Sequence, residues 1–214
     1  DRSSSGAYEI EYNYEATALA SNMIQLAVEG RSVPSLEIVP EAVTGSTRFN
    51  KCTTSQQSTL ITARSNASVY ASNSLSYLNA GTVGPRYTTW FGVYDANRYN
   101  TAKNHFSAIG SAMDTQSVTF DCSCKKKNVY AYVYPNQPYK IYLCGVFWTA
   151  PATGTDSKAG TLIHEMSHFT VVAGTDDWAY GQTHAKALAI SDPAKAVDNA
   201  DSHEYFAENT PVQQ

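Results

Sequence analysis

Residues 7–15 alternate between apolar and polar side chains. In this segment, AYEIEYNYE, one face of an extended chain carries Tyr8, Ile10, Tyr12 and Tyr14, and the other carries all three glutamates. This period of two predicts a half-buried β-strand. MIQLAVEG (23–30) and SLEIV (35–39) predict two further strands. We therefore expect a β-rich N-terminal segment that ends in a linker near 41–47.

From residue 55 onward the spacing of apolar residues becomes helical. This spacing predicts a helix over 55–79, and a second helix is expected over 96–113. Three apolar segments then predict strands: VTFDCSC, NVYAYVY and KIYLCGVFW. Helices are expected again at 157–172, at 181–190 and from Pro193 to about Glu208. Helices, a small antiparallel sheet and more helices indicate an α+β domain that is mainly helical.

The charge of the chain is divided unevenly along its length. The formal net charge is −4, of which residues 1–46 carry −5, so that residues 47–214 carry +1. We therefore divide the chain into a segment of residues 1–46 and a domain of residues 47–214. The acidic balance gives no basic surface for nucleic acid or an anionic membrane. No apolar run approaches the ~20 residues that a membrane span needs.

Four cysteines lie in the second part of a chain rich in Tyr, Ser and Thr. An even number of cysteines in such a chain indicates a secreted, extracellular protein with two disulfides. Cys122 and Cys124 are too close along one strand to bond to each other without strain, which leaves two pairings. We prefer Cys52–Cys122 with Cys124–Cys144, because the second pair can meet across a hairpin. Asn66 begins a sequon for N-glycosylation.

The segment TLIHEMSHFTVVAGTDDWAYG (161–181) contains the candidate chemistry. His164 and His168 are four residues apart, so a helix presents both imidazoles on one face, where they can share a metal. Glu165 can reach a metal-bound water as a general base. A catalytic zinc needs a third protein ligand. Asp176 and Asp177 both qualify by spacing, since Gly174 can end the helix and turn the chain back.

HEMSH (164–168) followed by GTDDWAYG (174–181) resembles the signature of the aspzincins, the deuterolysin-like zinc endopeptidases of fungi and bacteria. The similarity runs from about Cys52 to the C-terminus. With RYTTWFG (86–92), YLCGVFW (142–148) and NADSHEYFAEN (199–209), the chain looks most like the fungal peptidyl-Lys metalloendopeptidases.

This resemblance implies a zincin-type fold and specific roles for five residues. His164, His168 and Asp177 would bind one catalytic Zn²⁺, and Glu165 would be the base. The Tyr180 hydroxyl would stabilise the oxyanion of the tetrahedral intermediate.

Asp201 and Glu204 are three residues apart, on one face of an expected helix. Spacing alone favours a solvated acidic face. The resemblance implies instead an S1′ subsite for lysine, so that protein and peptide substrates are cut on the amino side of lysine. His203, between the two, is expected to be a surface residue or an outer partner of the site.

Residues 1–46 have no counterpart in the mature enzymes that the chain resembles. They look like the C-terminal part of a propeptide, so we expect a zymogen or propeptide-bound form, otherwise monomeric. Two alternatives stay open: a deuterolysin-like protease of broad specificity, and a catalytically idle secreted binding or defence protein on the same fold.

Overall fold

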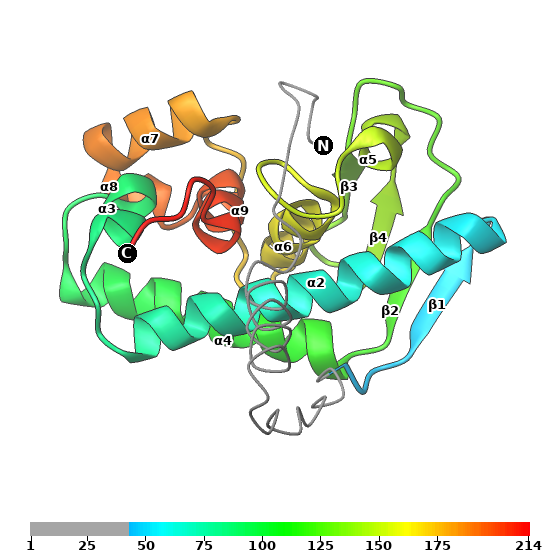
Figure 1. Ribbon diagram of the computed structural model, residues 1–214, viewed down its shortest axis with the longest axis horizontal. Helices are drawn as coiled ribbons and strands as arrows, with labels where there is room; N and C mark the ends of the chain where they lie inside the picture. The colour runs from blue at the N-terminus through cyan, green and yellow to red at the C-terminus, as the bar shows by residue number, and fades with distance from the viewer. Residues whose placement is uncertain (1–42) are drawn as a thin grey trace, which may run out of the picture.

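Residues 43–214 are described by the computed structural model (Figure 1). The strands predicted at 7–15, 23–30 and 35–39 lie outside the described residues. The strands are β1 (Thr47–Asn50), β2 (Val118–Asp121), β3 (Ala131–Tyr132) and β4 (Lys140–Leu143). The helices are α2 (Thr54–Asn79), α3 (Pro85–Phe91), α4 (Ala96–Thr115), α5 (Gly145–Thr149), α6 (Lys158–His168), α7 (Gln182–Ser191), α8 (Pro193–Ala196) and α9 (Ala200–Glu208).

The two long helices confirm the predictions at 55–79 and 96–113. Helix α2 begins with a capping box, in which the Thr53 side chain accepts from the Gln56 amide and the Gln56 side chain accepts from the Thr53 amide. Helix α4 begins at Asp95, whose carboxylate accepts from the amide of Arg98. Each helix therefore starts where a side chain satisfies amides that have no partner within the helix.

The four strands form a mixed sheet in the order β1-β2-β4-β3. β1 is parallel to β2, β2 is parallel to β4, and only the short β3 runs antiparallel to β4. The predicted antiparallel sheet is therefore wrong in strand direction, although the α+β class is confirmed. Tight turns between consecutive strands would make them antiparallel, whereas the chain between β2 and β4 crosses back and makes these two strands parallel.

Three further boundaries differ from the predictions. The strand predicted through KIYLCGVFW ends at Leu143, and the chain turns into α5 at Gly145. A side chain at Gly145 would lie 2.9 Å from the Lys127 Cα, so the close approach of these segments requires glycine. Helix α6 ends at His168 because Phe169 adopts an extended backbone. The helix predicted from Pro193 is divided into α8 and α9.

Both disulfides have the preferred pairing, Cys52–Cys122 and Cys124–Cys144. The expected hairpin is not the reason. Cys124 and Cys144 follow the C-terminal ends of the neighbouring parallel strands β2 and β4, which brings them together. The bridges thus join β2 to the start of α2 and to the start of α5.

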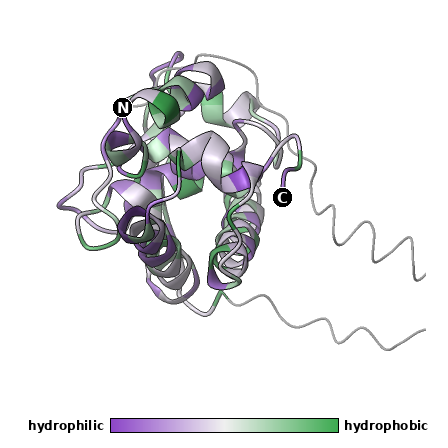
Figure 2. Cartoon of the chain, turned by 90° about the vertical axis from the view of Figure 1, so that its left-hand side faces the viewer, coloured by the Kyte–Doolittle hydropathy of each residue, from purple (hydrophilic) through white to green (hydrophobic). Residues whose placement is uncertain are grey.

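Asn66 lies in the middle of α2 and is only 4% exposed. The folded domain therefore does not present this sequon on its surface. Helix α2 buries several polar residues of this kind, and Figure 2 shows polar and apolar residues mixed along the same helices. The three residues of a sequon do not indicate whether the asparagine is buried in the folded protein.

Helix α6 lies at the centre of the domain, between the sheet and the group formed by α7, α8 and α9 (Figure 1). Every residue from Ala159 to His168 is buried. Helix α6 packs on α2 and α9, with Leu162, Ile163 and Met166 in the core. Among the described residues, no helix is both long and apolar enough to cross a bilayer.

Candidate active site

The N-terminus of α6 is anchored on the last turn of α9. Ser157 caps the helix by accepting from the amide of Gly160 at 2.8 Å. The Glu208 carboxylate accepts from the amides of Asp156 and Ser157 at 2.8 and 2.9 Å, and from the Ser157 hydroxyl at 3.1 Å. Burial and then the neighbouring Glu204 raise the pKa of Glu208 well above its usual range, although the hydrogen bonds from the two amides oppose this. The helix that carries both histidines is therefore fixed at its start by a residue far along the chain.

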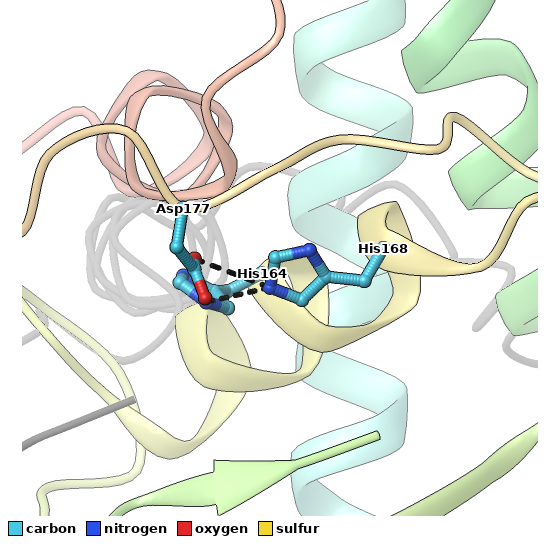
Figure 3. Close-up of side chains that lie close together, drawn as sticks. All are labelled: His164, His168 and Asp177. Carbon is cyan, nitrogen blue, oxygen red and sulfur yellow. Dashed lines mark hydrogen bonds and ion pairs between the residues drawn. The ribbon is translucent and has the colours of Figure 1, made fainter. Parts of the chain in front are cut away.

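Three side chains converge on one point beside α6 (Figure 3). Nε2 of His164 lies 3.2 Å from Nε2 of His168, and Oδ1 of Asp177 lies 3.1 Å from the first and 3.2 Å from the second. Ligands ~2.0–2.1 Å from a tetrahedral zinc are separated by about 3.3 Å. The triangle of two nitrogens and one oxygen therefore fits a zinc ion in size and in donor chemistry.

Asp177 reaches this point because the chain turns back after α6. Gly174 has a φ of +60°, a conformation that favours glycine. The next residue, Thr175, is held against α6 because its carbonyl accepts from Nδ1 of His168 at 2.7 Å. Asp176 is exposed, whereas Asp177 points into the triangle. Spacing along the chain allowed either aspartate to be the third ligand, and the structure places Asp177 at the triangle.

Asp177 and Glu165 differ in how the site affects their protonation. Burial would raise the pKa of Asp177, but the two imidazoles outweigh it and hold the pKa well below its usual range. Burial raises the pKa of Glu165, and the imidazoles offset only part of the rise. Oε1 of Glu165 lies 3.9 Å from Nε2 of His164 and has no hydrogen-bond partner among residues 43–214. Asp177 thus suits a ligand, and Glu165 a base with a free oxygen at the triangle.

Tyr180 is half-buried on the same returning segment. Burial and then the nearby carboxylate of Asp177 raise the pKa of its hydroxyl, so the phenol stays protonated. A protonated phenol beside the triangle can donate a hydrogen bond to an oxygen that gains charge.

Asp201 and Glu204 lie behind His164 and are buried, at 1% and 0% exposure. Oδ1 of Asp201 is 2.7 Å from Nδ1 of His164, and Oε2 of Glu204 is 3.4 Å from the same nitrogen. The pair is therefore not the solvated acidic face that spacing favoured. Nδ1 of each histidine has an acceptor, so Nε2 is the nitrogen that each ring presents to the triangle.

His203 is fully buried, so its expected place at the surface is wrong. Its Nδ1 donates to the carbonyl of Asn199 at 2.8 Å, and its Nε2 lies 2.9 Å from Nδ1 of His105. Burial lowers the pKa of His203 to about 3 and that of His105 to about 4, so both rings are neutral. The two histidines form a structural pair that joins α9 to α4.

Sequence reasoning missed Asn199 and Glu208. Both contact segments that carry the site, through hydrogen bonds to residues 178–179 and 156–157. Their place within NADSHEYFAEN was the available signal, but spacing along the chain does not reveal partners twenty or fifty residues away.

A family model described as lysine-specific metallo-endopeptidase, the aspzincins, matches residues 76–208. The chain belongs to this family. The match includes both histidines, Glu165, Asp177 and Tyr180 within one aligned region. The catalytic metal that the family implies is consistent with the donor set of the triangle.

The relatives come from a bacterium and from fungi. An extracellular protease of Aeromonas hydrophila is 49% identical over 99% of this chain and 66% of its own length. Peptidyl-Lys metalloendopeptidases of Grifola frondosa and Pleurotus ostreatus are each 55% identical over 77% of this chain, and the matches cover 47% and 98% of the relatives. The chain thus spans about half to two thirds of the length of the first two relatives.

A solved zinc peptidase from Grifola frondosa has the same fold, with a TM-score of 0.74 at 54% identity. The match covers 76% of this chain and all of that one.

The two adjacent aspartates provide a test of the metal site. We expect Asp177→Ala to lower zinc affinity by at least about 100-fold, because it removes one of three ligands. Asp176→Ala is the matched control and should bind zinc like the unmodified chain, because its exposed carboxylate lies outside the triangle. The zinc content of each variant after dialysis against a competing chelator compares their affinities. Equal retention by the two variants would contradict the assignment.

Proposed function

We propose that this chain is a zinc endopeptidase that hydrolyses peptide bonds on the amino side of lysine. The observation that carries the proposal is the triangle of two imidazole nitrogens and one carboxylate oxygen, with a buried carboxylate and a protonated phenol beside it. The names of the fungal relatives support the lysine specificity.

His164, His168 and Asp177 are the residues that would hold the metal. When bound there, zinc would polarise the substrate carbonyl and lower the pKa of a water toward ~7. Glu165 accepts the proton that this water loses as the water oxygen bonds to the carbonyl carbon. Tyr180 donates a hydrogen bond to the carbonyl oxygen as that oxygen gains negative charge. When the C–N bond breaks, Glu165 returns the proton to the leaving amine.

Asp201 and Glu204 are the residues that we propose for lysine recognition. Both carboxylates contact the metal ligand His164, so they adjoin the place where the bond is cut. A compact ammonium group forms a strong charge-assisted pair with such carboxylates. Glu204 is the better candidate for a direct contact, because Asp201 also holds His164 and accepts from the amide of Gly181 at 2.7 Å. Glu204 is fully buried, so in this proposal the side chain becomes accessible when the lysine binds.

We also propose that residues 1–46 are the C-terminal part of a propeptide. The match to the Pleurotus enzyme covers 98% of that protein but 77% of this chain, whereas the Aeromonas match covers 99% of this chain. Secretion is supported by the two disulfides and by the name of the Aeromonas relative.

Glu165→Gln tests the general base. The amide keeps the size of the side chain but cannot accept a proton, so we expect turnover to fall by about 10³-fold or more while zinc stays bound. Steady-state kinetics on a lysine peptide, with zinc content measured on the same sample, check this. Near-normal turnover of Glu165→Gln with zinc bound would contradict the assignment of Glu165 as the general base.

The cleavage pattern tests the proposed function and the lysine contact together. Peptides cut from a denatured protein should begin with lysine, and a chelator should abolish cutting. Glu204→Gln should lower kcat/KM for lysine at P1′ by about 10–100-fold and change other cuts less. Asp201→Asn should lower kcat on every substrate, because it disturbs His164.

Mass spectrometry of the peptides scores the residue after each cut. Cutting without a lysine preference in the unmodified chain would favour the broad-specificity alternative.

Removal of residues 1–46 tests latency. If the segment is an inhibitory propeptide, a chain cut near Thr47 and separated from the fragment should hydrolyse peptides at least about tenfold faster than the intact chain. Readdition of the segment as a peptide should lower the rate again. Equal rates before and after removal would leave the segment with a folding role.

A further inference from the structure

Asn199 occupies a helix cap but does not use its side chain as a cap. It is the residue before α9, where asparagine commonly accepts a hydrogen bond from the first turn of the helix, yet the side chain makes no such bond. The side chain is fully buried instead. Its hydrogen bonds must therefore serve another part of the structure.

The amide of Asn199 binds the segment that carries Asp177 and Tyr180. Oδ1 accepts from the amides of Trp178 at 2.9 Å and Ala179 at 3.0 Å. Nδ2 donates to the carbonyl of Ala179 at 3.2 Å and to the Ser202 hydroxyl at 3.0 Å. These four bonds use both acceptor sites and both donors of the side chain.

The backbone around Asn199 holds the same segment on the other side of Asp177. The amide of Asp176 donates to the carbonyl of Asp198 at 2.8 Å, and the amide of Ala200 donates to the carbonyl of Asp176 at 3.0 Å. Residue 176 is thus tied by backbone bonds, and residues 178 and 179 are tied by one side chain. Asp177 lies between these tethered residues, and Tyr180 follows them directly.

The first turn of α9 therefore contacts both sides of the metal triangle. Asn199 holds the segment of Asp177, and Asp201, two residues later, holds Nδ1 of His164 at 2.7 Å. A metal ligand has to stay within a few tenths of an ångström of its position for the triangle to keep its size. The distance between the ligand from the segment and the ligand from α6 is set by this turn.

We propose that Asn199 is a positioning residue for the metal ligand Asp177 and for Tyr180. This inference rests on the proposed function, since it concerns the same metal site. Asn199 touches neither substrate nor metal, and its effect passes through the backbone of residues 178 and 179.

Asn199→Ser is the test, with Ser202→Ala as the matched control. Serine is also a good helix cap, so α9 can still begin at residue 199, but its short hydroxyl cannot span the bonds to residues 178 and 179. Ser202→Ala removes one buried partner of Asn199 without touching the segment. The readouts are zinc affinity by competition with a chelator, the visible absorption of the cobalt-loaded protein, and kcat and KM separately.

We expect Asn199→Ser to lower zinc affinity by about 10–100-fold, to change the cobalt spectrum and to lower kcat more than KM. Ser202→Ala should stay within about threefold of the unmodified chain in each readout. Zinc affinity, cobalt spectrum and kcat of Asn199→Ser that match the unmodified chain would overturn the inference.

A second variant keeps the test decisive if Asn199→Ser does not fold. Asn199→Asp keeps the acceptor but loses the donors and sets a carboxylate against the carbonyl of Ala179, so a loss of zinc affinity of at least about fivefold is expected. Unchanged affinity in that variant would overturn the inference. Failure of the proposed function is separate, because it would appear as an unmodified chain that neither binds zinc nor cuts peptides.

Discussion

The active site depends on the packing of α6 against α9 through charged and polar side chains. His164, Glu165, Asp201, Glu204 and Glu208 are all buried, which is costly unless each group has a partner. Glu208 is satisfied by the amides at the start of α6, and Asp201 by His164 and Gly181. The contact is close because Gly160 has no side chain: a Cβ there would lie 1.9 Å from Oε1 of Glu208.

The site is therefore formed by α6 and α9, two helices that pack together although they are separated along the chain. Helix α6 supplies His164, His168 and Glu165, and Asp201 of α9 holds His164 through Nδ1. A variant that removes one member leaves the other member as a buried charge without compensation, which costs several kcal/mol in typical cases (about 3–5). Asp201 of α9 and the carbonyl of Thr175 in the following loop accept from the Nδ1 atoms of His164 and His168, so each ring is held in one orientation.

The segment between α6 and α7 completes the site without regular secondary structure. It leaves α6 at Phe169, turns at Gly174 and is then tied to residues 198–201 by backbone and side-chain hydrogen bonds. A loop held in this way can place a ligand and a hydrogen-bond donor as accurately as a helix does. The two disulfides and the buried Arg64, which donates to three backbone carbonyls around β1 and the end of α4, stabilise the opposite half of the domain.

Features that depend on neighbours along the chain could be predicted from the sequence. The helices at 55–79 and 96–113, the two histidines on one helical face and the turn at Gly174 follow from local spacing and backbone preference. The aspzincin motif added the choice of Asp177 by resemblance.

The direction of the strands, the burial of Asn66, Asp201 and Glu204, the exposure of Asp176 and the hydrogen bonds of Asn199 to residues 178 and 179 became visible only in the folded domain. These features depend on which distant segments pack together. The same three-residue spacing of Asp201 and Glu204 fits a wet surface or a dry interior equally well. The contact with His164, thirty-seven residues earlier in the chain, is what makes the interior position stable.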